Sequence, residues 1–434
     1  MFDRPSRGER AILLHIRVGR PPYREDAGEF AALAESAGAE IAGDIEARLR
    51  TVNSRYLIGT GKLDELREMA DGVDADVILI DHALTPAQER NLERALRRRV
   101  VDRTGLILDI FALRAHTFEG KLQVELAQLD HLSTRLVRGW SHLERQKGGI
   151  GLRGPGETQL ETDRRLLGIR IRQLHSRLDR LEKRRSLARR HRQKREMPTI
   201  SLVGYTNAGK STLFNRLTDA GVLVADQLFA TLDPTIRRIE LPEGRPVVLA
   251  DTVGFVRDLP HELVAAFQST LEETLQARLL LHVVDCSDPQ HLERIEDVNR
   301  VLRQIGADHI PTIQVYNKAD ILGVPPRVDR AETSMPERVW LSAATGDGLD
   351  ALLSAILEFL HLDVVRGQVR LGVEQARLRA LLYDRAKVVG EQALPEGGWI
   401  LNVEIERRSY DELRRGEKLE FLEIADPARP IMAH

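Results

Sequence analysis

Hydrophobic and polar positions alternate along the first 115 residues in a way that predicts strands and helices in turn. Apolar runs at 12–18, 76–80 and 105–110 resemble strands, whereas 30–37, 63–70 and 86–96 carry apolar residues at helical spacing. This alternation is typical of a small α/β domain with a largely parallel sheet.

The next 80 residues carry two seams of apolar positions spaced alternately three and four apart, which predict two packed helices. Between them, Lys147-Gly-Gly-Ile-Gly-Leu-Arg-Gly-Pro-Gly156 suits neither helix nor strand, and Thr158-Gln-Leu-Glu161 resembles a capping box that restarts a helix. We expect an antiparallel helical hairpin, with a first helix of about 28 residues and a tip loop at 147–156. The seams are Leu122, Leu126, Leu129, Ser133, Leu136, Trp140 and Leu143, then Leu167, Ile171, Leu174, Leu178, Leu181, Arg185 and Ala188.

A glycine-rich turn then links a strand-like run, 199–203, to a helix-like run, 212–217. Its sequence, Gly204-Tyr-Thr-Asn-Ala-Gly-Lys-Ser211, has the spacing of a loop whose amide groups surround a polyphosphate at a helix N-terminus. Lys210 would reach the β- and γ-phosphates, and the Ser211 hydroxyl would bind Mg²⁺. This motif predicts a nucleoside triphosphate site.

Asn317-Lys-Ala-Asp320 follows the apolar run 312–316 and indicates which base is bound. The Asp320 carboxylate can accept from the ring N–H and the amino group of guanine, a donor pair that adenine lacks. Asn317 can reach N7, and the Lys318 stem can cover the ring. Taken alone, this tetrapeptide is more often an ordinary helix cap, but its place at a strand end after the phosphate loop favours guanine. The turn at 342–344 suits a backbone contact to the guanine oxygen.

Between these motifs lie two segments that can sense the γ-phosphate. Asp251-Thr-Val-Gly254 follows a strand-like run, so Asp251 can hold Mg²⁺ through water and the Gly254 N–H can meet the γ-phosphate. The polar loop 229–235 resembles the Phe-Thr-Thr-Leu stretch of Obg-type GTPases, and this resemblance favours Thr231 as the Mg²⁺ ligand, with Thr235 as the alternative. The expected nucleotide-binding residues are Gly204, Tyr205, Thr206, Asn207, Ala208, Gly209, Lys210, Ser211, Phe229, Ala230, Thr231, Leu232, Asp233, Asp251, Thr252, Val253, Gly254, Asn317, Lys318, Ala319, Asp320, Ser342, Ala343 and Ala344.

Phe255 occupies the position after Gly254 at which Ras-like proteins carry a glutamine that positions water. Phenylalanine cannot do this by hydrogen bonding, so hydrolysis should be slow without help, and the catalytic group stays unassigned. Phe255 would then simply pack beside the switch. Asn207 could help to bind K⁺ or could only brace the loop.

Composition and charge narrow the class of protein. Hydrophobic residues make up 42% and charged residues 30%, as in globular proteins, and 434 residues suffice for about three domains. Cys286 is the single cysteine, which excludes an intrachain disulfide, and the apolar runs are too short for a membrane span or signal peptide. We expect a cytoplasmic monomer.

The net charge of −2 conceals a strongly basic segment. Residues 164–195 contain fourteen Lys and Arg against two acidic residues, a balance of +12 that leaves −14 for the remainder. Such a block is often only a solvated helix face, but its arginine density favours a partner with a phosphate backbone. The candidate RNA contacts are Arg153 in the tip loop and Arg189, Arg190 and Arg192 in the basic helix.

We therefore expect an α/β chain of four parts: an N-terminal α/β domain (1–115), the helical hairpin arm (116–197), a P-loop GTPase domain (198–362) and a small C-terminal α/β domain (363–434). In the first part, Gly59-Thr-Gly-Lys62 resembles a fragment of a phosphate loop without its full spacing. It is either a second nucleotide site or the start of a helix with a surface lysine.

Several of these motifs together resemble the HflX-type GTPase family, over residues 10 to 360. The carriers are the segments 56–62, 148–165, 204–211, 229–235 and 251–255, and the long glycine-rich one is specific to that family. The resemblance implies a GTPase that associates with the large ribosomal subunit and its rRNA, is stimulated by ribosomes, and splits or rescues them under stress. Some members are reported to use ATP and to remodel RNA through the N-terminal part, which gives the alternative function.

Overall fold

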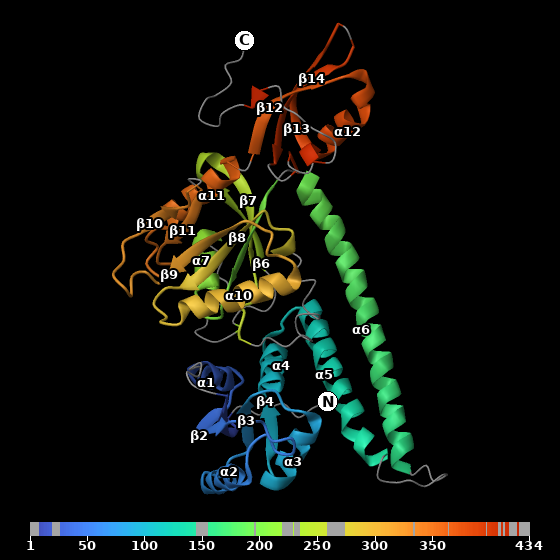
Figure 1. The fold of residues 1–434 in the computed structure, drawn as a ribbon, viewed down its shortest axis with the longest axis vertical. Helices are drawn as coiled ribbons and strands as arrows, with labels where there is room; N and C mark the ends of the chain where they lie inside the picture. The colour runs from blue at the N-terminus through green and yellow to red at the C-terminus, as the bar shows by residue number, and fades with distance from the viewer. Residues whose placement is uncertain are drawn as a thin grey trace. The chain divides into compact units, whose positions relative to one another are not determined.

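In the computed structural model, the chain divides into two compact units, Met1–Ile239 with Pro246–Leu322, and Glu240–Arg245 with Gly323–His434 (Figure 1). Each unit is described by itself. The structure describes all residues except 1–7, 20–26, 145–154, 195–196, 219–228, 230–234, 258–273, 333–334, 363, 396, 407–408, 411–412, 416–422 and 425–434.

The first unit begins with a four-stranded parallel sheet of order β2-β1-β3-β4. Successive residues of β1 and β3 face opposite sides, so Leu13 and Leu79 join one buried cluster while Ile12 and Ile78 join another. Helices α1 and α4 cover the first face and α2 and α3 the second. The predicted small α/β domain is confirmed. Its elements are β1 (Arg10–Val18), α1 (Ala27–Ser36), β2 (Glu40–Leu49), α2 (Thr60–Gly72), β3 (Val77–Asp81), α3 (Pro86–Leu96), β4 (Arg99–Asp102) and α4 (Arg103–Arg114).

The predicted strand at 105–110 is wrong, because these residues lie inside α4. The Asp102 side chain accepts a hydrogen bond from the Gly105 N–H and so caps the helix. Residues 106–108, 110 and 111 are all buried. A helix buried on several sides shows an unbroken apolar run, which is also the pattern of a buried strand.

The hairpin arm consists of α5 (Phe118–Glu144) and α6 (Pro155–Lys194), two helices that run side by side in opposite directions (Figure 1). Leu122, Leu126 and Leu174 are buried between them, with Leu129, Ile171, Leu178 and Leu181 packed around. The α5 half of the arm has 27 residues, close to the predicted length. The second helix starts at Pro155, earlier than the capping box at 158–161 predicts, since proline suits a first helical turn.

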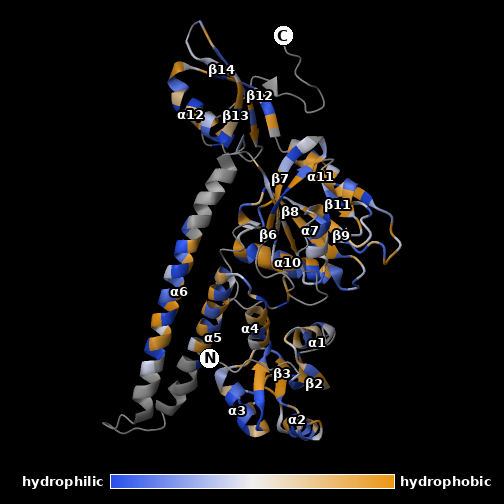
Figure 2. Cartoon of the chain, turned by 180° about the vertical axis from the view of Figure 1, so that it is seen from behind, coloured by the Kyte–Doolittle hydropathy of each residue, from blue (hydrophilic) through white to orange (hydrophobic). Residues whose placement is uncertain are grey.

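A second sheet in this unit has the strand order β9-β8-β5-β7-β6. Strands β5, β7, β8 and β9 are parallel. Figure 2 colours many residues of these strands as hydrophobic. Helix α10 packs Val298, Val301 and Leu302 against Val203 and Leu280 of the sheet. The elements are β5 (Thr199–Gly204), α7 (Lys210–Thr218), β6 (Thr235–Leu241), β7 (Arg245–Asp251), β8 (Leu279–Asp285), α10 (His291–Ile305) and β9 (Thr312–Asn317).

The second unit contains an antiparallel strand pair, β10 (Arg327–Arg330) with β11 (Pro336–Trp340), and helix α11 (Leu349–Leu362). It also contains an antiparallel sheet of order β13-β14-β12-β15, against which α12 (Ala376–Arg385) packs Leu378 and Leu382. This agrees with the expected small α/β region. The strands are β12 (Val364–Leu371), β13 (Ala386–Ala393), β14 (Trp399–Glu406) and β15 (Glu423–Ile424).

Among the described residues of both units, every helix is too short or too polar to cross a membrane.

Candidate functional site

The loop 204–211 connects β5 to α7, as the sequence predicts. Gly204 has a φ of +151°, and a Cβ there would lie 2.3 Å from the Val283 carbonyl oxygen. Gly209 has a φ of +91°, and its Cβ would lie 2.2 Å from Asn317 Nδ2. Both positions therefore require glycine, and the uncovered backbone can approach phosphate groups closely.

Lys210 lies at the start of α7 and folds back over the loop. Its Nζ donates hydrogen bonds to the carbonyl oxygens of Gly204 (3.0 Å) and Tyr205 (2.7 Å). Burial lowers the pKa of Lys210 to about 8, against the opposing attraction of Asp251. Burial, with repulsion from Lys210, also lowers the pKa of His282 to about 4, so this neighbour is neutral at pH 7. The loop thus holds one ammonium group where a polyphosphate would need it.

Ser211 and Asp251 form the corner where a metal ion would be held. Asp251 ends β7 and is fully buried, and the Ser211 Oγ donates a hydrogen bond of 3.0 Å to its Oδ2. A hydroxyl beside a carboxylate is the all-oxygen donor set that Mg²⁺ prefers. The residues present therefore fit the expected metal.

The segment after β7 is tied to the phosphate loop through its backbone. The Phe255 N–H donates to the Gly204 carbonyl (3.1 Å), and the Thr206 N–H donates to the Phe255 carbonyl (2.7 Å). The Phe255 side chain is 1% exposed and lies in the same buried cluster as Tyr205, Leu280 and Val298. The interpretation that Phe255 packs beside the switch is confirmed, and its ring is turned away from solvent.

The N-terminal part of the unit contacts this site through a buried polar network. The Tyr205 hydroxyl donates to the Glu29 carboxylate and accepts from the Arg257 N–H (2.8 Å). Arg103 pairs with Glu29 and with Asp81 (2.8 Å) and donates to the Arg257 carbonyl (3.3 Å). Sequence reasoning singled out Tyr205 but missed Glu29, Asp81, Arg103 and Arg257. Their only signal was charged side chains within apolar surroundings.

The Asp81 and Arg103 side chains are charged despite their burial. Burial alone would raise the pKa of Asp81, but the neighbouring His15 side chain and the hydrogen-bonded Arg103 guanidinium hold it below its usual value. Burial would lower the pKa of Arg103, but Glu29 and Asp81 raise it instead. The network is therefore an ionic one.

The side chains of Asn317 and Lys318, at the end of β9, both contact other residues of the unit. The Asn317 Nδ2 donates to the Ala208 carbonyl (2.8 Å), which joins the predicted base-binding motif to the phosphate loop. The Lys318 Nζ lies 2.7 Å from Asp285 Oδ2. Burial would raise the pKa of Asp285, but hydrogen bonds from Lys318 and Ser287 lower it. Asp320 is exposed, and its contact with guanine stays a prediction.

The turn 342–344 lies in the second unit. The Ser342 N–H donates to the Asp347 carbonyl (2.9 Å), and the Ser342 Oγ accepts from the Thr345 N–H (3.2 Å). These bonds fix the turn that follows β11. A contact of Ala343 or Ala344 with guanine stays a prediction.

Of the loop 229–235, the structure describes only the two ends. Phe229 is buried, and its ring centroid lies 4.6 Å from that of Phe111. Thr235 begins β6. Ala230, Thr231, Leu232 and Asp233 lie outside the described residues, so the choice of Thr231 as a metal ligand stays a prediction.

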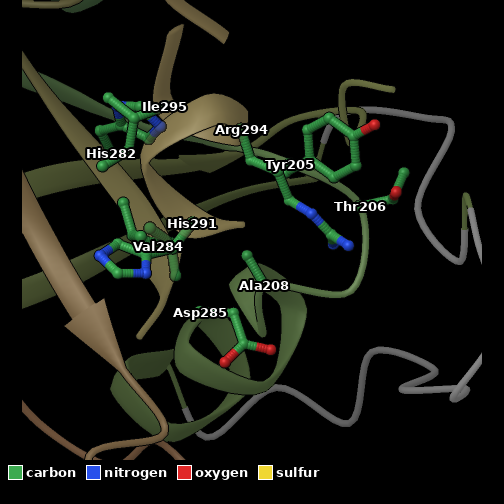
Figure 3. Close-up of a pocket in the computed structure, with 10 residues that line it drawn as sticks. Tyr205, Thr206, Ala208, His282, Val284, Asp285, His291, Arg294 and Ile295 are labelled. Carbon is green, nitrogen blue, oxygen red and sulfur yellow. The ribbon is translucent and has the colours of Figure 1, made fainter. Parts of the chain in front are cut away.

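Behind the phosphate loop lies a pocket between Tyr205 and Ala208 on one side and β8 and α10 on the other (Figure 3). The Arg294 guanidinium stacks 4.9 Å from the Tyr205 ring centroid, and its Nε lies 2.6 Å from Asp288 Oδ2. A cation over this ring further restrains the first residues of the loop.

The predicted RNA contacts lie in the arm. Arg189, Arg190 and Arg192 belong to α6, although their side chains are outside the described part, as is the whole of Arg153. Arg172, Arg177, Arg180 and Lys183, in the described portion of α6, are exposed.

Four family descriptions match successive segments of the chain. They are GTP-binding GTPase N-terminal (residues 24–112), GTP-binding GTPase Middle Region (114–192), 50S ribosome-binding GTPase (199–318) and HflX C-terminal domain (327–420). The last match extends the resemblance beyond residue 360, into the C-terminal part of the chain.

Curated relatives match nearly the whole chain. GTPase HflX of Escherichia coli is 57% identical over 404 residues, which cover 93% of this chain and 95% of that protein. GTPase HflX of Magnetococcus marinus is 47% identical over 394 residues, which cover 90% of this chain and 91% of that protein. Among solved structures, a GTP-binding protein from Sulfolobus solfataricus in complex with GDP is 23% identical, with a TM-score of 0.42. The match covers 81% of this chain and 98% of that chain. The four matched segments and the two curated relatives show that the chain belongs to the HflX family of GTPases.

Proposed function

We propose that this GTPase binds the large ribosomal subunit through its helical arm and uses GTP to separate ribosomal subunits in the cytoplasm under stress. The observation that carries the proposal is the arm itself. Its two helices bury a narrow apolar seam, and the exposed side of α6 presents arginine and lysine side chains. A long basic helix joined to a GTPase suits the phosphate backbone of rRNA. The match of residues 199–318 to a 50S ribosome-binding GTPase supports the same partner.

GTP would bind with its phosphates at the loop and Lys210 and its guanine at Asp320. Ser211 and Thr231 would hold Mg²⁺ directly, with Asp251 acting through water. The ion would neutralise charge on the β- and γ-phosphates. Since Phe255 offers no hydrogen bond to water, hydrolysis should be slow in the free protein and should rise by orders of magnitude with large subunits, about 10³-fold by analogy with other activated GTPases. Equal rates with and without subunits would contradict this.

We also keep K⁺ binding by Asn207 as a proposal. Asn207 is exposed and has a φ of +60° in the middle of the loop. GTP hydrolysis measured in KCl and in NaCl tests it. Equal rates in the two salts would leave Asn207 with a bracing role only.

Variants of the tip loop and of the basic helix should lose different activities. Replacing 148–154, which contains Arg153, by a Gly-Ser linker should leave GTP binding intact and subunit binding moderately weakened, yet abolish splitting in sucrose gradients. Splitting at the wild-type level would make the loop a passive connector.

Neutralising Arg189, Arg190 and Arg192 should weaken subunit binding and flatten its salt dependence, because fewer counterions are released. A matched control neutralises three arginines outside the arm, namely Arg94, Arg300 and Arg303. Equal losses in the two triple variants would remove the assignment of α6 as the RNA-binding element.

The comparisons do not favour the alternative, an RNA-remodelling ATPase centred on the N-terminal domain. Its candidate lysine, Lys62, pairs with Glu65 on the same helix, at 2.7 Å.

A further inference from the structure

The side chain of Thr206, in the middle of the phosphate loop, is not explained by the fold. Thr206 is 3% exposed, and within the described part of the chain its Oγ1 is buried without a hydrogen-bond partner. Burying a hydroxyl in this way costs free energy, so native structures seldom keep such a group unless a ligand completes it. The neighbouring hydroxyl of Thr252 is satisfied, because it donates to the Leu202 carbonyl at 2.6 Å.

The residue that carries this hydroxyl lies beside Gly254 and Lys210. A Cβ placed on Gly254 would lie 2.8 Å from Thr206 Cγ2 and 3.1 Å from both Thr206 Cα and Lys210 Nζ. Thr206 therefore packs directly against Gly254 and beside the loop lysine, the two groups between which a γ-phosphate would bind. Figure 3 shows Thr206 among the residues of the loop.

The backbone N–H of Thr206 already has a hydrogen-bond acceptor within the protein. Its N–H donates to the Phe255 carbonyl at 2.7 Å, so it cannot also serve a phosphate oxygen. The hydroxyl is thus the remaining donor of this residue. Phe255 is buried in the core and supplies no polar side chain at the position after Gly254. Another polar group must therefore orient the attacking water, and the Thr206 hydroxyl can do so.

We propose that Thr206 is a catalytic residue of GTP hydrolysis. Its Oγ1 donates a hydrogen bond to a γ-phosphate oxygen and accepts one from the attacking water. The water oxygen forms a bond to Pγ, the bond from Pγ to the bridging oxygen breaks, and GDP leaves with that electron pair. The proton released from water passes to phosphate, and Thr206 ends unchanged.

Two substitutions separate this role from packing. Thr206→Val keeps the shape and removes the hydroxyl, whereas Thr206→Ser keeps the hydroxyl. In single-turnover hydrolysis by the full chain without ribosomes, we expect Thr206→Val to be slower by about 10- to 100-fold and Thr206→Ser to stay within about threefold of wild type. GDP affinity should change by less than about twofold, while affinity for GDP with aluminium fluoride, which mimics the transferring phosphoryl group, should fall as much as the rate.

The matched control is Thr218→Val at the end of α7, whose hydroxyl donates to the Phe214 carbonyl at 2.7 Å. It should hydrolyse GTP at the wild-type rate. Thr206→Ala, which places less bulk against Gly254, repeats the test, and the proposal requires that at least one of the valine and alanine variants keeps its GDP affinity while its rate falls.

Three results would overturn the proposal: a wild-type rate for the valine variant, an equally slow serine variant, or a loss of GDP affinity as large as the loss of rate. Because no ribosome is present in the assay, these results leave the proposed ribosomal function untouched.

Discussion

The two sheets of the first unit use the carboxyl ends of their parallel strands differently. In α/β proteins this edge is where ligands bind. In the N-terminal sheet, Asp81 at the end of β3 pairs with Arg103, and Asp102 at the end of β4 pairs with Arg135 at 2.8 Å. In the second sheet, the corresponding ends lead into the phosphate loop and the metal corner. Polar residues at this edge can therefore hold the fold together in one sheet and bind a ligand in the other.

The glycine and lysine turns of the two sheets show the same contrast. Added Cβ atoms on Gly59 and Gly61 would meet nothing within 4 Å, whereas those on Gly204 and Gly209 would collide with packed groups. Lys62 is partly exposed and pairs along its own helix, whereas Lys210 is buried and held by loop carbonyls. A glycine that sterics require, together with a lysine held inward, distinguishes a phosphate loop from a helix start.

The largest difference in GTP binding should come from replacing one glycine by alanine in each of the two glycine and lysine turns. Gly209→Ala should abolish measurable GTP binding, because its Cβ would fall 2.2 Å from Asn317 Nδ2 in a backbone conformation that favours glycine. Gly61→Ala lies within α2 in open space and should leave binding unchanged, with a small gain in stability of about 0.5–1 kcal/mol. Filter binding and thermal unfolding measure both. Similar losses in the two variants would break the contrast.

Asp320→Asn should shift the preference from guanine to xanthine nucleotides. The carboxylate accepts from two guanine donors, and an amide presents a donor where one acceptor was. We expect GTP affinity to fall by several kcal/mol, roughly 100-fold or more, because the site's polar groups are left unpaired. Competition between GTP and XTP in a filter-binding titration checks this, and unchanged GTP affinity would rule out the assignment.

Arg103→Met tests the ionic edge of the N-terminal sheet. Removing the guanidinium leaves Glu29 and Asp81 as buried carboxylates without their cation, which should destabilise the fold by about 3–5 kcal/mol. Arg303→Met breaks an exposed pair with Glu296 and should cost less than about 1 kcal/mol. Denaturant unfolding compares the two. A loss below about 1 kcal/mol for Arg103→Met would mean that the network adds little.

A smaller effect follows from the lowered pKa of Lys210. In the unliganded protein this amine loses its proton as the pH rises through about 8, whereas bound phosphates favour the charged form. GTP binding should therefore take up a proton above pH 8, and affinity should fall as pH rises. Calorimetry at pH 8.5 in two buffers of different ionisation enthalpy measures the uptake. A Lys210→Arg variant, which does not titrate there, should show none, and equal uptake by both proteins would contradict the assignment to Lys210.

The sequence was most informative where one short segment carries both structure and chemistry. The glycine spacing before Lys210 and the apolar run before Asn317 correctly predicted a loop between a strand and a helix and a strand that ends at Asn317. The run 105–110 misled, because burial on several faces removes helical periodicity. Strand β2 escaped notice because charged residues interrupt Glu40–Leu49.

The network of Glu29, Arg103 and Tyr205 could not be predicted from sequence. Its members are up to 176 positions apart, and only the folded chain brings them together.

Nucleotide binding by full-length variants of the two lysines tests the central claim most directly. Equilibrium binding of GTP and ATP would be measured for the wild type, Lys210→Ala and Lys62→Ala. We expect one GTP per chain in the wild type, a loss of about 3 kcal/mol or roughly 100-fold in affinity for Lys210→Ala, and no change beyond about twofold for Lys62→Ala. Tight triphosphate binding that survives Lys210→Ala and disappears in Lys62→Ala would contradict the account, because it would place the nucleotide site in the N-terminal sheet.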